Sequence, residues 1–168
     1  MHVDLVPASR DDEPRLGRLV QLYAYDFSEF MGMDVGEDAR FDVGHVLTRA
    51  WTEASRRVYL IRVAGTLAGF VMLDAQSRLT GDTEVMDVAE FFVMRRYRRH
   101  GVGRACARRA FDLFPRRWEV REQANNAPAI AFWRATIADY TGGRFQEAFV
   151  DDERWRGPVQ SFDARDRR

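Results

Sequence analysis

Residues 89–104 read AEFFVMRRYRRHGVGR, and this stretch decides the fold. Its first part completes an apolar, β-rich run over about residues 84–94, which predicts a buried strand. The second part has the pattern Arg98-x-x-Gly101-x-Gly103, and the apolar stripe after it predicts a helix that starts near Gly101. A strand, a basic glycine loop and a helix therefore follow one another directly.

This loop has the chemistry of an anion-binding site. The start of a helix exposes unpaired N–H groups and the positive end of the helix dipole, and glycine lets the backbone approach an anion closely. Arg98, Arg99 and Arg104 can add charge-assisted hydrogen bonds. The spacing is that of neither a P-loop nor a dinucleotide fingerprint. The alternative is an ordinary glycine loop with solvated arginines.

Periodicity places further elements on both sides of this unit. A Gly65-Thr66 pair predicts a hairpin turn, and Gly142-Gly143 predicts the end of the last helix. An antiparallel meander followed by a crossover helix gives a mixed sheet with helices on both faces. The sequence predicts strands over residues 2–7, 57–64, 67–74, 84–94, 118–122, 145–150 and 159–162, and helices over about 14–30, after Asp42, over 101–114 and after Asn125-Asn126.

Length and composition indicate one domain. The chain has 168 residues, of which 46% are hydrophobic, and we expect a single domain over 1–164 with a disordered tail over 165–168. No segment reads as a signal peptide or a membrane span, so we expect no membrane partner. One cysteine, Cys106, cannot form an internal disulfide, which favours a reducing compartment, the cytoplasm. Three scattered histidines predict no metal site.

Charge argues against nucleic acid as a partner. The formal net charge is zero, whereas nucleic-acid-binding domains are usually basic. Residues 95–117 nevertheless hold nine arginines and one acidic residue, Asp112, so one surface is expected to be positive. A nucleic-acid-binding domain built on this cluster is therefore kept as a minor alternative. The chain contains no lysine, which removes lysine as a nucleophile or base.

Two motifs in this order resemble those of a known family. The stretch 89–104 resembles the acetyl-CoA-binding motif of the GNAT N-acetyltransferase superfamily, Gln/Arg-x-x-Gly-x-Gly/Ala. Asn126-x-x-Ala129-Ile130-x-Phe132-Trp133 is similar to its second motif, Asn-x-x-Ala-hydrophobic-x-hydrophobic-Tyr. The region after Phe132 looks like a group of acetyltransferases with undefined substrate. The resemblance implies an α/β fold of the α+β type, with a mixed, mostly antiparallel sheet of about seven strands flanked by helices, similar to acyl-CoA N-acyltransferases.

The resemblance also implies a role for each matching residue. The cofactor would be acetyl-CoA, with its pyrophosphate on the loop and its pantetheine arm along a strand edge. A backbone N–H near Val93 would polarise the thioester carbonyl. Asn126 would contact the end of the pantetheine, and Phe132 and Trp133 would line its wall. The residues expected to bind the cofactor are Phe91, Phe92, Val93, Arg98, Arg99, His100, Gly101, Val102, Gly103, Arg104, Asn126, Phe132 and Trp133.

The sequence departs from the family at two positions. Arg99 stands where relatives often have glycine, and it can tilt the loop or add a phosphate contact. Trp133 stands where many relatives have a tyrosine that protonates the departing thiolate, and an indole N–H is not a useful acid. The acid is then either dispensable, because a thiolate is a good leaving group, or supplied by Tyr140 or Tyr23.

Glu90 and Asp87 are competing candidates for the base that takes the proton of the amine. Glu90 lies in an apolar strand, where a carboxylate is costly unless it is paired or used. Strand alternation puts Asp87 and Glu90 on opposite faces unless a bulge intervenes, so they are alternatives and not a dyad. An ion pair between Glu90 and a nearby arginine is the structural alternative.

The end of the first helix is the candidate substrate wall. Tyr25, Asp26 and Glu29 are the candidate substrate residues, and such a wall suits a cationic amine. Tyr23, Phe27 and Phe30 are assigned to the core instead, and so is Cys106. We expect transfer of an acetyl group from acetyl-CoA to a primary amine of a small molecule or peptide by direct attack. The alternatives are a sensor that binds acyl-CoA without turnover and, for assembly, a homodimer through the terminal strands.

Overall fold

The structure is a computed structural model that describes residues 2–166. Seven strands form one sheet in the order β1-β2-β3-β4-β5-β7-β6. All neighbouring pairs are antiparallel except β4 and β5, which confirms the mixed, mostly antiparallel sheet. The elements are β1 (Val3–Pro7), α1 (Glu13–Met31), α2 (Gly44–Thr52), β2 (Arg56–Val63), β3 (Thr66–Asp74), β4 (Val85–Val93), α3 (Val102–Leu113), β5 (Arg117–Arg121), α4 (Ala127–Thr141), β6 (Gln146–Asp152) and β7 (Trp155–Asp163).

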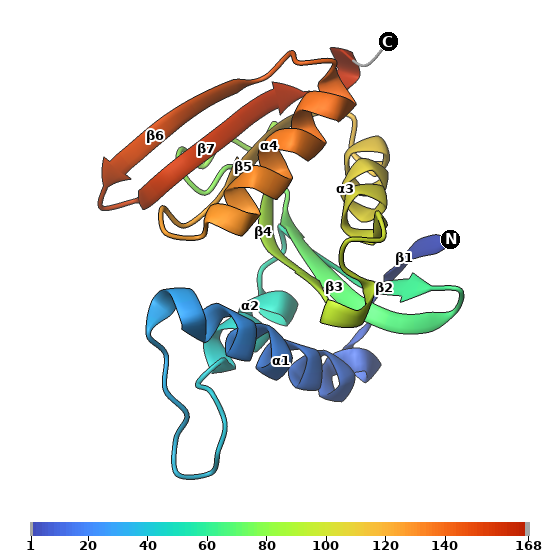
Figure 1. Ribbon diagram of the computed structural model, residues 1–168, viewed down its shortest axis with the longest axis vertical. Helices are drawn as coiled ribbons and strands as arrows, with labels where there is room; N and C mark the ends of the chain where they lie inside the picture. Colours follow the sequence, from blue (N-terminus) through green and yellow to red (C-terminus); the bar gives the residue numbers. More distant parts are fainter. Residues whose placement is uncertain (1, 167–168) are drawn as a thin grey trace.

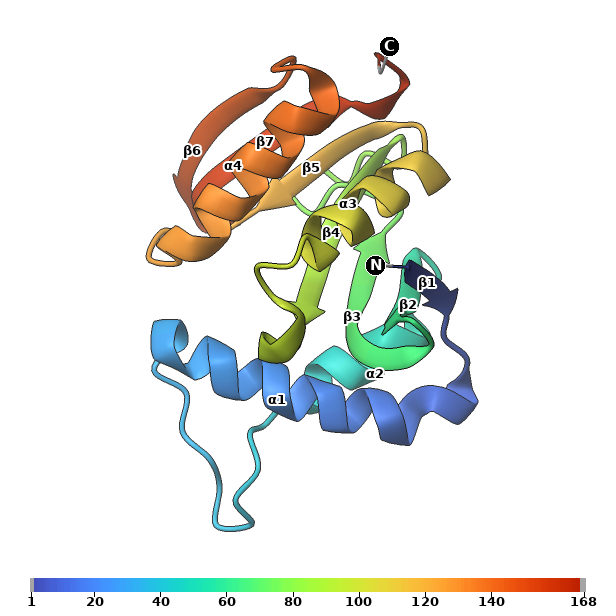
Figure 2. The same cartoon turned by 45° about the vertical axis from the view of Figure 1, so that its right-hand side comes forward.

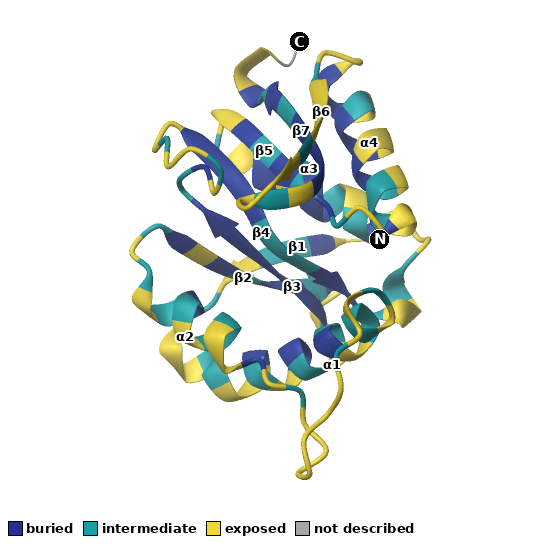
Figure 3. Ribbon diagram, turned by 90° about the vertical axis from the view of Figure 1, so that its left-hand side faces the viewer, coloured by how far each residue is buried: buried dark blue, intermediate teal, exposed yellow. Residues whose placement is uncertain are grey.

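Helices cover both faces of the sheet, and each face has its own core (Figures 1 and 3). Helices α1 and α2 pack on one face, where Leu16 and Val20 meet Phe70 of β3. Helices α3 and α4 pack on the other face, where Cys106 and Ile137 meet Trp118 of β5. Within residues 2–166, no helix combines the length and apolar character needed to cross a membrane.

Local signals set the ends of the helices. Asn126 caps α4, since its side-chain oxygen accepts a hydrogen bond from the Ala129 amide at 3.1 Å. Helix α1 ends at Gly32 and α4 at Gly142, both with left-handed backbone. The tail that we expected to be disordered begins inside a short turn, Ala164–Asp166. Residues 167 and 168 of that expected tail lie outside the described residues.

The hairpin between β2 and β3 turns one residue earlier than predicted. Its two connecting residues are Ala64 and Gly65, both with positive φ, and Thr66 is the first residue of β3. A two-residue turn with positive φ at both positions matches the twist of the strands, and alanine at the first position gave no sequence signal for it.

Strands β3 and β4 approach each other closely at Gly69. A Cβ atom at this position would lie 2.0 Å from the carbonyl oxygen of Phe92. Only glycine allows this approach, because real Cβ atoms do not come so near a backbone oxygen. Gly69 therefore fixes the position of the β4 residues that follow Glu90.

Strands β4 and β5 separate soon after they begin (Figure 2). The pairing covers only Val85–Asp87 of β4 and Arg117–Glu119 of β5. One edge of β4 beyond Asp87 therefore has no strand beside it, and the sheet opens into two halves, β1–β4 and β5–β7–β6.

A bulge at Ala89 changes which face Glu90 occupies. Met72 pairs with Glu90 and Leu73 pairs with Val88, so Ala89 has no opposite residue in β3. The expectation of opposite faces for Asp87 and Glu90 therefore does not hold. Both side chains lie on the face that α1 and α2 cover, which is the bulged alternative that the sequence left open.

Candidate active site

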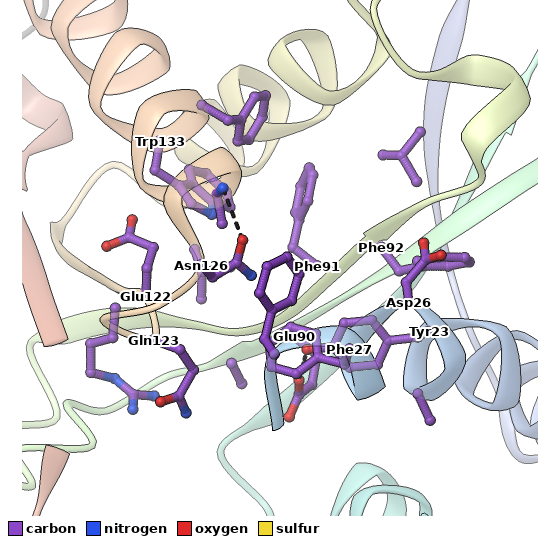
Figure 4. Close-up of a pocket in the computed structure, with 18 of the residues that line it drawn as sticks. Tyr23, Asp26, Phe27, Glu90, Phe91, Phe92, Glu122, Gln123, Asn126 and Trp133 are labelled. Atoms are coloured by element: carbon purple, nitrogen blue, oxygen red, sulfur yellow. Dashed lines mark hydrogen bonds between the residues drawn. The ribbon is translucent and has the colours of Figure 1, made fainter. Parts of the chain in front are cut away.

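A large cleft lies where β4 and β5 separate, and it has a volume of about 1210 Å³. The end of α1, the glycine loop and the start of α4 form its walls. Figure 4 shows Glu122, Asn126 and Trp133 along one side and Tyr23, Phe92 and Asp26 along the other. A long, flexible ligand can therefore run from the glycine loop into the middle of the sheet.

The glycine loop forms one end of this cleft. Gly101 is the N-cap of α3 with a φ of 78°, a conformation that favours glycine. A Cβ atom on Gly103 would lie 3.1 Å from the Phe132 ring, so glycine lets the first turn of α3 touch the aromatic wall. The first amides of α3 have no partner inside the helix and can bind an anion.

Arginines of the loop divide into two groups. Arg99 and Arg104 line the cleft, and within residues 2–166 neither has an ion pair. Arg98 is occupied, because its Nε donates to the Val93 carbonyl at 2.6 Å and its Nη2 pairs with Asp26. Arg98 also lines the cleft, but its side chain ties the loop to β4 and α1, and its contact with phosphate stays a prediction.

Two other expected cofactor residues face away from the cleft. His100 and Val102 are not among the residues that line it. Val102 is buried in the core beneath α3, and the Nδ1 atom of His100 lies 2.7 Å from the Arg98 carbonyl oxygen. Their side chains therefore hold the loop, and any contact with a cofactor would come from their backbone.

The backbone of Arg99 has a conformation that glycine adopts more easily than other residues. Its φ is 62°, in the left-handed region that costs a residue with a Cβ atom roughly 1 kcal/mol. This backbone exposes the Arg99 side chain at the mouth of the cleft. Arginine therefore takes up the left-handed backbone here. Of the two expectations, a tilted loop or an added phosphate contact, its position at the cleft favours the contact.

An aromatic wall joins β4 to α4. The ring of Phe91 lies 4.9 Å from Trp133 and 5.9 Å from Phe132 between centroids. Trp133 is 6% exposed, so its indole is mostly a packing surface. Asn126 lines the cleft on the same side as Trp133, and its side-chain oxygen accepts the hydrogen bond that caps α4.

The open edge of β4 presents backbone groups to the cleft. The Met94 amide donates to the Ala68 carbonyl at 2.8 Å, toward β3. Backbone groups of successive strand residues point to opposite edges. The amides of Phe91 and Val93 therefore point to the open edge, where an extended ligand can pair with them.

Glu90 lies under this edge and is bonded to a tyrosine. The Tyr23 hydroxyl donates to Glu90 Oε2 at 2.7 Å, and both residues line the cleft. Burial raises the pKa of Glu90 above its usual range, and the Tyr23 hydrogen bond opposes the rise. Burial and the Glu90 charge raise the pKa of Tyr23 well above normal. This carboxyl group is thus a better proton acceptor than an exposed one.

Asp87 is unsuited to act as a base. It is fully buried, does not line the cleft, and accepts two hydrogen bonds from Arg121, both at 2.9 Å. Both oxygens of this carboxylate are thus engaged by the Arg121 guanidinium, and neither is presented to a ligand in the cleft. The structure therefore favours Glu90 over Asp87.

Tyr140 does not reach the cleft. Its hydroxyl donates to Asp112 Oδ1 at 2.9 Å, between α4 and α3, and its ring packs on Phe111. The candidacy of Tyr140 as the acid is corrected on this geometry. Tyr23 is the tyrosine that lines the cleft.

The expected substrate residues separate in the structure. Tyr25 is 64% exposed and lies outside the cleft, whereas Asp26 and Glu29 line it. Asp26 is already neutralised by Arg95, at 2.8 Å, and by Arg98. Of the three, only Glu29 keeps a carboxylate without an ion pair in the described part of the chain.

Three aromatic residues that the sequence assigned to the core also line the cleft, namely Tyr23, Phe27 and Phe30. Helical spacing cannot separate a core stripe from a cleft wall, because both are apolar. Asn125 was missed as well: its Nδ2 donates to the Phe30 carbonyl at 2.6 Å and joins the start of α4 to the end of α1.

Glu122 is a further lining residue that the sequence did not single out. It follows β5 and is 4% exposed. Burial raises its pKa to about 8, and neither of its carboxyl oxygens has a hydrogen-bond partner within residues 2–166. Glu122 is therefore mostly protonated at neutral pH and brings little negative charge to the cleft.

Comparisons with known proteins identify the family of this chain. A model of the acetyltransferase (GNAT) family matches residues 19–136. An acetyltransferase from Thermus thermophilus has a similar structure, with a TM-score of 0.72, 19% identity and coverage of 97% of both chains. The PaiA N-acetyltransferase from Thermoplasma acidophilum in complex with coenzyme A has a TM-score of 0.64 and 11% identity, with coverage of 97% of this chain and 99% of that one.

A spermidine N-acetyltransferase from Vibrio cholerae, in complex with CoA and spermine, gives a TM-score of 0.61 and 12% identity, with coverage of 95% and 93%. Identities this low show the fold alone. A comparison with curated proteins finds no match. The family match spans most of the chain, including both motifs, and acetyl-CoA is the donor in this family. The chain therefore belongs to the GNAT acetyltransferase family and is an acyltransferase that uses acetyl-CoA.

Proposed function

We propose that this protein transfers the acetyl group of acetyl-CoA to a primary amine by direct attack. The observation that carries the proposal is the position of Glu90, a half-buried carboxyl group whose pKa desolvation raises, in the wall of the cleft beside the open edge of β4. The amine nitrogen attacks the thioester carbon, Glu90 takes the amine proton, and the C–S bond breaks to release the coenzyme A thiolate. No covalent enzyme intermediate is required.

Cofactor binding follows the length of the cleft. The pyrophosphate is assigned to the first amides of α3 with Arg99 and Arg104, and the pantetheine arm to the β4 edge at Phe91 and Val93. The Val93 amide would polarise the thioester carbonyl. Two observations support these assignments. The amides of Phe91 and Val93 face an open edge, and Arg99 and Arg104 have no ion pair in the described residues.

Isothermal titration with acetyl-CoA, followed by turnover with a panel of amines, tests this function. We expect binding, and we expect Arg104→Ala to weaken it about tenfold, the effect of one charge-assisted hydrogen bond to phosphate. Arg96→Ala is the matched control, because Arg96 lies in the same segment but does not line the cleft. Absence of binding by the wild-type protein would refute the proposal, and binding without turnover of any amine would identify a sensor.

Tyr23→Phe tests whether Glu90 sets the acidic limb of activity. The Tyr23 hydrogen bond lowers the pKa of Glu90, so its loss raises that pKa. The base must be deprotonated to act, and the acidic limb of kcat/KM should therefore move to higher pH while the plateau changes little. Steady-state kinetics across the acidic range measures the shift, with Tyr59→Phe as control. A limb that does not move would remove Glu90 as the titrating group.

The acceptor is proposed to be a small-molecule or peptide amine. Phe27 and Phe30 give the cleft an apolar wall, and Glu29 adds one carboxylate at its rim. The spermidine N-acetyltransferase among the similar structures makes polyamines a necessary part of the panel. A cytoplasmic location and a homodimer remain predictions from the sequence.

A further inference from the structure

Four elements of the fold each contribute an arginine that lines the cleft. We call this set the arginine cluster. It consists of Arg49 of α2, Arg56 of β2, Arg78 of the β3–β4 connection and Arg121 of β5. The charges of Arg56, Arg121 and Arg49 act on the pKa of Glu90, which places these three near the proposed base. These three arginines therefore lie at the acceptor end of the cleft, and Arg78 lines the same cleft.

The carboxylates that pair with the arginine cluster stay behind it. Arg49 bonds Glu53 at 2.6 Å, Arg56 contacts Asp74 at 2.9 Å, and Arg121 contacts Asp87 at 2.9 Å. None of these three carboxylates lines the cleft. An acceptor therefore meets guanidinium groups first, while the compensating charges are held in the protein behind them.

Arg78 is the member with free hydrogen-bonding capacity. It is exposed at the rim and, within residues 2–166, has no ion pair. Its charge reaches Asp74, which burial keeps at a raised pKa, but the two make no ion pair at contact distance. A guanidinium with five donors and no partner is suited to hold a carboxylate in a bidentate contact.

Negative charge is scarce at the same end of the cleft. Asp26 is bound by two arginines, Glu122 is mostly protonated near neutral pH, and Glu90 is the proposed base. Glu29 remains, on the opposite rim at the end of α1. A second ammonium group on the acceptor would therefore face the arginine cluster and would find few carboxylates with which to form an ion pair. This charge pattern disfavours polyamines and favours an acceptor that carries an anion.

We propose that the acceptor is an amino acid or a similar molecule that carries both the reacting primary amine and a carboxylate, with the carboxylate bound by Arg78 of the arginine cluster. This inference rests on the proposed function and narrows its substrate class. The amine faces Glu90 and the thioester, and the carboxylate replaces solvent on Arg78. The reaction itself is unchanged: the amine proton goes to Glu90 and the thiolate leaves.

Matched acceptor pairs test the carboxylate directly. Leucine with leucinamide, and phenylalanine with phenylalaninamide, differ only in the charge next to the amine. We expect the ratio of kcat/KM for acid over amide to fall about tenfold or more in Arg78→Ala, and to fall further in Arg78→Glu. Comparing ratios between variants cancels the different reactivity of the two amines. Arg116→Ala should leave the ratio unchanged, because Arg116 contacts the Thr83 carbonyl of the same β3–β4 connection but does not line the cleft.

Binding in the absence of turnover separates this inference from the proposed function. Each pair is titrated into protein saturated with coenzyme A, which forms a ternary complex that cannot react. We expect the acid to bind more tightly than the amide, and Arg78→Ala to remove the difference. Equal binding of acid and amide, a ratio unaffected by Arg78→Ala, or a preference for spermidine overturns the inference alone. Tighter binding of the acid without any acetylation would instead refute the transferase function.

Discussion

Glu90→Gln is expected to lower kcat for acetyl transfer by about two to four orders of magnitude, the usual contribution of a general base. Glutamine keeps the size of the side chain and can still accept the Tyr23 hydrogen bond, but it cannot take a proton from the amine. Affinity for acetyl-CoA should change by less than about threefold, because the pyrophosphate and pantetheine contacts lie elsewhere. Single-turnover kinetics with saturating donor isolates the chemical step.

Two variants control for the loss of a carboxylate in the sheet. Glu119 lies on β5, outside the cleft, and accepts a hydrogen bond from the Ser77 hydroxyl at 2.7 Å, as Glu90 does from Tyr23. Glu119→Gln should therefore keep kcat. Asp87→Asn should instead lower stability, because it leaves Arg121 without its full charge partner. A kcat for Glu90→Gln close to wild type would show that the amine loses its proton to solvent or to another group.

Gly69→Ala is expected to lower the free energy of unfolding by about 3 kcal/mol or more, since its Cβ would lie 2.0 Å from a backbone oxygen of β4. Backbone cannot rotate away as a side chain can, so β3 and β4 must separate and lose ladder hydrogen bonds. The melting temperature should fall by roughly 10 °C for a chain of this size. Acetyl-CoA affinity should fall too, because Gly69 positions the Phe91 and Val93 edge.

Gly65→Ala separates crowding from backbone strain. Gly65 also has positive φ, but a Cβ atom there would meet nothing within 4 Å. It should cost only about 1 kcal/mol, the penalty for a left-handed alanine. Calorimetry of both variants with and without acetyl-CoA gives the comparison. Equal destabilisation in the two variants would mean that the close approach of β3 to β4 relaxes easily.

Sequence reasoning succeeded where the signal is local. The glycine loop, the start of α4 at Asn126 and its end at Gly142 each depend on a few adjacent residues, and each appears in the structure as predicted. The mixed, mostly antiparallel character of the sheet followed from the same elements, because a meander and a crossover helix allow few arrangements. The residues alone predicted only that the loop binds an anion, and the family motifs identified the cofactor as acetyl-CoA.

What the sequence could not provide depends on residues far apart in the chain. The bulge at Ala89 exists only in the pairing with β3, and it moves Glu90 to the face of Asp87. Asp26 looked like a free substrate carboxylate until the fold brought Arg98 to it, 72 residues later. Tyr23 had the spacing of a core residue, and its bond to Glu90 crosses 67 residues. Such contacts decide which charges remain free.

The separation of β4 from β5 gives the bound cofactor a structural role of its own. Three residue pairs join the parallel strands, and beyond them an extended ligand would stand in for the absent strand. The amides of Phe91 and Val93 should then exchange their hydrogens quickly in the free protein and slowly in the complex, while that of Phe92, which faces β3, stays protected throughout. Hydrogen exchange at alternate residues of β4 would therefore report whether a ligand fills the gap between β4 and β5.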